Sequence, residues 1–85
     1  MMNLDYTVKA AILYNLEDAQ EELAQIMGEM LRSQAEVDET EFKVRMAHVY
    51  SHLNIAWNMR NVSETDLESA DGEQMNAWSR FPTDL

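Results

Sequence analysis

The chain has 85 residues, with 16 acidic and six basic side chains and a formal net charge of −10 at pH 7. This length accommodates one hydrophobic core, so we expect a single helical domain over residues 1–85. The absence of cysteine excludes disulfides, thiolate-bound zinc and thiol nucleophiles. The excess of negative charge argues against direct binding to nucleic acid or to anionic membranes, so neither is an expected partner.

The N-terminal part of the chain predicts a helix over 5–14, either as a short separate element or as the start of the next helix. Glycine and proline are rare throughout, with two and one residues, which favours an all-α fold. Apolar residues alternate between Tyr6 and Tyr14 and would also permit a strand, although no partner strand is evident.

The next two helices are predicted at 16–32 and 39–60. Asn15 followed by Asp18, and Asp38 followed by Glu41, resemble N-caps with acidic residues in the first turn. After each cap, apolar residues recur at steps of three and four, as on one face of a helix. These residues are Leu16, Ala19, Leu23, Ile26 and Met30 in the first helix and Phe42, Met46, Val49, Leu53 and Ala56 in the second. The short connection predicts a central antiparallel hairpin.

Ser63 with Asp66 predicts the start of a last helix at 64–80. Gly72 could interrupt this helix, and Pro82 would end it because proline disfavours helical backbone at the preceding residue. The tail is expected to pack Phe81, and with it Leu85, against the bundle. The predicted fold class is thus a small helical bundle of three main helices, or four with a short one at the N-terminus.

The central helix differs in charge from its neighbours. Residues 42–63 carry three basic side chains and no acidic one, whereas 1–41 carry ten acids and two bases, and 64–85 carry six acids and one base. This distribution favours packing of the central helix between the two acidic segments.

The central helix has two apolar arcs when it is drawn at about 100° per residue. The larger arc is expected to pack within the chain. The smaller arc and the adjacent histidines form a candidate interaction surface, which consists of Val44, His48, His52, Ile55 and Met59. A helix that is apolar on two sides usually has neighbours on both, so we expect a homodimer or a complex with another protein through this surface.

The end of the central helix contains a candidate pocket for a small anionic or aromatic ligand. Its residues are Trp57, Asn58, Arg60 and Asn61. A cation in the last helical turn complements the helix dipole, and the Arg60 guanidinium could stack on the Trp57 indole.

His48 and His52 have the spacing of two metal ligands on one helix. Val49 follows His48, so the HExxH pattern is absent, and the helix supplies no carboxylate as a third ligand. We therefore predict no metal site, no other cofactor and no catalytic residue. No Ser-His-Asp order or glycine-rich phosphate loop is present either.

The acidic first half of the chain resembles all-α nucleotide pyrophosphohydrolases, which hold Mg²⁺ between carboxylates of paired helices. Their signature sets an ExxE on one helix against an ExxD on the next. Here Glu36 falls in the predicted connection and Glu39 at its end, where the next helix is expected to begin, and Glu22 and Glu29 are more simply read as part of a solvated face.

The favoured function is a non-enzymatic interaction module that self-associates through its central helix. A cytoplasmic location is expected, because the N-terminus lacks a signal-peptide pattern and no apolar run approaches the ~20 residues of a membrane span. Two alternatives remain open. One is an acidic inhibitor, or nucleic-acid-mimicking decoy, that docks on a basic partner, and the other is a helical Mg²⁺-dependent nucleotide phosphohydrolase.

Overall fold

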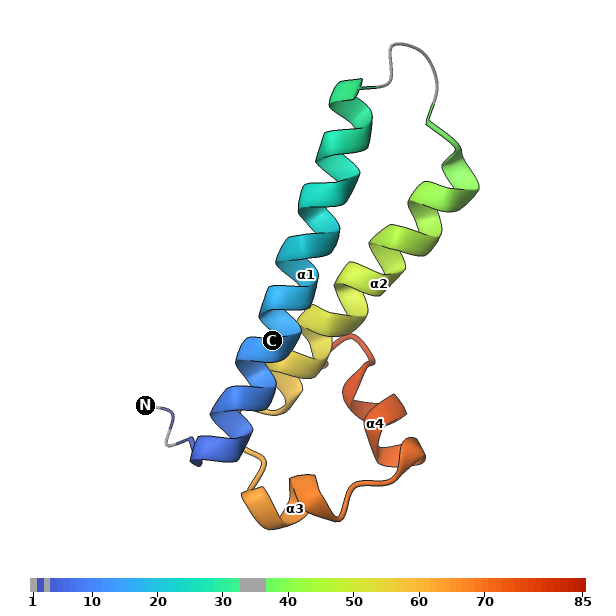
Figure 1. Ribbon diagram of the computed structural model, residues 1–85. Coiled ribbons are helices and arrows are strands. Elements are labelled where there is room, and N and C mark those ends of the chain that lie inside the picture. The colour runs from blue at the N-terminus through green and yellow to red at the C-terminus, as the bar shows by residue number, and fades with distance from the viewer. Residues whose placement is uncertain (1, 3, 33–36) are drawn as a thin grey trace.

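The computed structural model describes residues 2, 4–32 and 37–85, and every regular element in this part of the chain is a helix. In chain order these are α1 (Tyr6–Arg32), α2 (Glu39–Asn58), α3 (Glu64–Glu68) and α4 (Gly72–Trp78). The two long helices, α1 and α2, form an antiparallel hairpin, and α3 and α4 lie at the end where α2 finishes (Figure 1). The all-α prediction and the packing of two long helices are therefore confirmed.

α1 is one continuous helix of 27 residues, so the alternative in which 5–14 is the start of the next helix is confirmed, and the separate short helix and the strand are wrong. Asn15 is no cap but a buried residue in mid-helix. Its amide Nδ2 donates to the Ala11 carbonyl at 2.9 Å, and its Oδ1 lies 2.8 Å from His52 Nδ1. An asparagine side chain often competes with the helical backbone for hydrogen bonds. Here His52 of α2 binds the Asn15 side chain, so the helix continues through this residue.

α2 begins at the predicted cap. The Asp38 carboxylate accepts hydrogen bonds from the backbone N–H of Thr40 at 2.9 Å and of Glu41 at 3.4 Å. The helix ends at Asn58, two residues before the predicted end. Of the predicted connection between the long helices, residues 33–36 lie outside the described part of the chain.

The predicted helix 64–80 is in fact two short helices. Ser63 caps the first as expected, since its Oγ accepts a hydrogen bond from Asp66 N at 3.1 Å. Asp71 caps the second, accepting from Gln74 N at 2.8 Å. A second capping carboxylate directly before Gly72 stabilises a new helix start, which explains why the chain does not continue as one helix.

The short helices are held by hydrogen bonds to the long ones. Asn54 Nδ2 of α2 donates to the Ser79 carbonyl at 3.0 Å, and Asn58 Nδ2 donates to the carbonyls of Trp78 at 2.7 Å and Arg80 at 3.1 Å. The last carbonyls of a helix lack partners within it, so the two asparagines of α2 satisfy the end of α4. At the other short helix, Thr7 Oγ1 donates to the Glu64 carboxylate at 2.9 Å.

The hydrophobic core is narrow. Among the described residues, the buried apolar side chains are Val8, Ala19, Ile26, Val49, Ala56 and Met59. Phe42 and Met46 are half-buried against the central cluster of Ala19, Ile26 and Val49. The predicted packing of the tail is wrong, because Phe81 is 67% exposed and Leu85 77% exposed. Much of the apolar surface of the hairpin is left uncovered.

Candidate functional site

A seven-residue spacing of apolar residues organises both long helices. In the heptad notation abcdefg, positions a and d form the stripe along which helices pack, while e and g flank it. Position d is buried or half-buried and faces the other helix; it holds Ile12, Ala19 and Ile26 on α1 and Phe42, Val49 and Ala56 on α2. Around each helix, positions a and then e lie next to position d on one side, and position g lies next to it on the other side.

The g side of the hairpin carries polar contacts between α1 and α2. Arg45 Nη2 lies 2.9 Å from Glu29 Oε1, His48 Nδ1 lies 3.8 Å from Glu22 Oε2, and His52 Nδ1 lies 2.8 Å from Asn15 Oδ1. We call these six residues the polar ladder. Its α1 members, Asn15, Glu22 and Glu29, are seven residues apart and therefore share one helix face.

The two histidines of the polar ladder lie close to each other and to acidic residues of α1. Their rings are 4.8 Å apart, and His52 Nε2 lies 3.8 Å from Asp18 Oδ2. Among the described residues, no three His, Asp or Glu side chains are grouped as metal ligands would be. Glu22 and Glu29, the acids considered for a Mg²⁺ site, instead face His48 and Arg45.

The opposite side of the hairpin is apolar and open. Positions a and e hold large apolar side chains that are exposed to solvent, namely Leu13, Leu16, Leu23, Met27, Met30, Tyr50 and Leu53. We call these seven residues the apolar face. Both helices contribute to the same side, because Leu16 and Leu53 line one shared hollow with Ile12 and Ala56. α3 packs on α1 and α4 on α2 without covering this face.

The five residues of the predicted interaction surface do not form one surface. Val44 is 64% exposed and His48 is exposed, whereas Ile55 is half-buried and His52 contacts Asn15. Met59 is only 1% exposed, so its assignment to a surface is wrong. α2 ends at this point and the chain turns into α3, which packs on α1 and closes this end of the hairpin.

Three of the four residues of the predicted ligand pocket contact the C-terminal segment of the same chain. Trp57 Nε1 donates to Asp84 Oδ1 at 3.0 Å, and Arg60 Nη2 pairs with Asp84 Oδ2. The stacking that the sequence allowed is present, with Arg60 Cζ 4.0 Å from the centre of the Trp57 ring. We call this pair the Trp57–Arg60 clamp. Asn58 binds the end of α4 instead, and Asn61 is exposed.

Asp84 is the contact of this site that the sequence did not reveal. The Trp57 indole N–H, and then the Arg60 guanidinium, lower the pKa of its carboxyl below the ordinary value. Asp84 is 24 residues from Arg60, so no helical spacing connects the two. In the sequence, Asp84 is only a single carboxylate in the C-terminal tail. Nothing in its spacing from Trp57 and Arg60 indicates that it contacts them.

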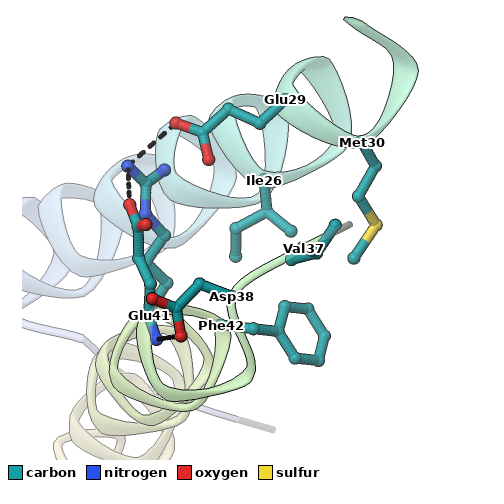
Figure 2. A pocket seen from close by; sticks show the side chains of 8 residues that line it. Ile26, Glu29, Met30, Val37, Asp38, Glu41 and Phe42 are labelled. Atoms are coloured by element: carbon teal, nitrogen blue, oxygen red, sulfur yellow. Dashed lines mark hydrogen bonds and ion pairs between the residues drawn. The ribbon is translucent and has the colours of Figure 1, made fainter. Parts of the chain in front are cut away.

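A small pocket of about 150 Å³ lies at the loop end of the hairpin. Ile26, Met30, Val37 and Phe42 turn toward one another there, and the carboxylates of three acidic residues stand around them (Figure 2). Its Arg45 pairs with two of these acids, Glu29 and Glu41. Such a pocket suits one apolar side chain and disfavours an anion.

The sequence matches no known protein-family model, and no curated protein and no solved structure is similar to the chain. In the described ranges, no helix has the length and apolar character needed to cross a membrane.

Proposed function

We propose that the chain is a non-enzymatic assembly module, in which two copies pair through their apolar faces. The observation that carries this proposal is the exposure of apolar side chains at positions a and e on both helices. Two helices that pack only on each other need a narrow stripe, whereas the helices of a four-helix bundle are apolar at a, d and a flanking position. The hairpin has the pattern of half a four-helix bundle.

The dimensions of the apolar face favour a second hairpin as the partner. From Leu13 to Met30 the face is about 26 Å long at 1.5 Å per residue, and two packed helices are about 20 Å wide. These dimensions give an area on the order of 500 Å² for the apolar face, without counting the added area of protruding side chains. This is close to the ~600 Å² per partner at the lower end of standard interfaces. A second copy supplies a surface of the same length and composition, and isologous pairing of this kind is the commonest symmetry of oligomers.

The charges around the apolar face also permit self-association despite the net charge of −10. Across 13–30 and 43–60, the charged residues at positions a and e are Lys43 and Arg60, and no carboxylate occupies these positions. The acids lie on the polar ladder and on outer faces. Pairing through the apolar face therefore buries no like-charged carboxylates, and repulsion between the distant ones is screened at physiological salt.

Leu23→Asp tests this proposal, with Val44→Asp as the matched control. Both substitutions place a carboxylate on an exposed apolar position, but Val44 lies outside the apolar face. Light scattering at low and high salt should give twice the 9.9 kDa chain mass for the wild type and for Val44→Asp, and the monomer mass for Leu23→Asp. Added salt should not dissociate the dimer, because apolar burial holds it.

A wild-type monomer at high protein concentration would refute the self-association. Binding to a basic partner that weakens steeply with salt would then favour the acidic decoy, since surface charge interactions are screened. If Val44→Asp dissociated the dimer and Leu23→Asp did not, the interface would instead be the smaller apolar arc of the central helix, which contains Val44. A cytoplasmic location forms part of this proposal and is checked by cell fractionation.

A further inference from the structure

We infer that the Trp57–Arg60 clamp, together with the apolar hollow beside it, is a binding site for a protein segment that carries an Asp or Glu next to a bulky apolar residue. Asp84 occupies the polar half of this site in the same chain. The inference concerns the end of α2 and stands without the pairing of two hairpins. Its hollow shares Leu16 and Leu53 with the apolar face, so a bound segment and a second copy compete for this end of the hairpin.

The receptor half of the site is held in place without Asp84. Arg60 Nη1 donates to the Trp57 carbonyl at 3.1 Å, and the guanidinium lies over the Trp57 ring. These contacts fix the arginine side chain, which is 21% exposed. An arginine that is already ordered loses little further freedom when it binds a carboxylate, and its planar group suits that ligand.

The seated Asp84 carboxylate shows what this site recognises. One oxygen accepts from the indole N–H and the other from the guanidinium, so both oxygens of the carboxylate are bound. A neutral amide could not make both contacts, because its NH₂ group would face one of the two donors. The site is therefore selective for an anionic, two-oxygen group.

An apolar hollow of about 280 Å³ adjoins the clamp. It is lined by Met2, Ile12, Leu16, Leu53 and Ala56 together with Trp57 and Arg60. Asp84 does not line it, and Leu85 remains exposed. The chain's own tail thus fills the carboxylate position, while its Leu85 stays out of the hollow although it is next to Asp84. A ligand that is not tethered at this point can place its apolar residue in the hollow and gain contacts that the tail does not make.

The contact with Asp84 is weak enough to be displaced. The Asp84 side chain is 55% exposed, and exposed ion pairs stabilise a fold only slightly. Phe81 and Leu85 on either side of it are also exposed. A ligand in solution competes with this tethered carboxylate, whose effective concentration is on the order of millimolar.

The test uses the full chain with Leu23→Asp, which lies outside the hollow and removes pairing through the apolar face. The probe is the acetylated and amidated peptide Phe-Pro-Thr-Asp-Leu, which copies residues 81–85. Binding is followed by the NMR resonance of the Trp57 indole N–H, assigned with Trp78→Phe. Asp84→Asn removes the charge and one of the two contacts with little change in shape, so the tail competes less, and this variant should bind the peptide about threefold to tenfold more tightly than the chain with Asp84 intact.

Two controls examine the halves of the site separately. Replacing the peptide's Asp by Asn should abolish binding, and so should Arg60→Met in the protein, whose fold is checked by circular dichroism. Replacing the peptide's Leu by Ser should weaken binding several-fold through loss of contact with the hollow. Equal affinity with and without Asp84, or binding that survives Arg60→Met, would overturn the inference.

Discussion

Val49→Ala tests whether α1 and α2 pack as described. Val49 is 3% exposed and belongs to the cluster with Ala19 and Ile26. The substitution removes two methyl groups, a loss of about 1.6 kcal/mol at ~0.8 kcal/mol per buried carbon, and the cavity adds to it. The higher helix propensity of alanine returns about 0.5 kcal/mol. We expect a net loss near 2 kcal/mol, out of roughly 4 to 13 kcal/mol for a domain of this length.

The control is Val44→Ala, which makes the same chemical change on the same helix. Val44 is exposed, so the free energy of unfolding should change by less than about 0.5 kcal/mol. Thermal melts followed by circular dichroism at one protein concentration should place Val49→Ala roughly 8 to 16 °C below the wild type, with Val44→Ala close to it. Equal melting temperatures for the two variants would refute the assignment of which arc of α2 faces α1.

Two further predictions concern local contacts. Asp38→Ala removes the carboxylate that caps α2 and should lower the free energy of unfolding by about 1 kcal/mol, whereas Asp38→Ser should retain most of it; equal losses in urea unfolding would contradict the capping role. The Asp84 contact should depend on pH with a definite sign. Because the pKa of Asp84 is lowered, the contact is complete above the ordinary carboxyl range and is lost as the pH falls through the lowered value. The Trp57 indole resonance should thus be unchanged from pH 7 to 5 and shift only below pH ~4, and a shift at pH 5 to 6 would contradict the assignment.

Features of the fold that depend on neighbouring residues were predictable from the sequence. Asp38 and Ser63 cap helices as expected, because each bonds to backbone within three residues. Asn15 has the same appearance in the sequence but does not start a helix. Its deciding partner is His52, 37 residues away on another helix.

The candidate site was only partly predictable for the same reason. A helical wheel identifies two apolar arcs on α2 but does not say which arc the rest of the chain covers, and Met59 was therefore misassigned. The stacking of Arg60 on Trp57, which the sequence allowed, is present, although α2 ends at Asn58 and Arg60 lies just beyond it. Asp84 was not predictable, because a tail outside any helix can bring many different residues to that point. The apolar face was not predictable either, because it depends on which sides of both helices the rest of the chain leaves exposed.

The polar ladder has a consequence for the alignment of the two long helices. The apolar d positions recur every seven residues, so sliding α2 along α1 by one heptad would still bring apolar side chains together. The same slip would separate Arg45 from Glu29 and His52 from Asn15, and it would set Ala56 against Ala19 in place of Val49. Apolar burial thus stabilises the hairpin without deciding how far its helices overlap. The polar contacts contribute little free energy each, but they select one overlap among several and thereby fix the outline of the apolar face.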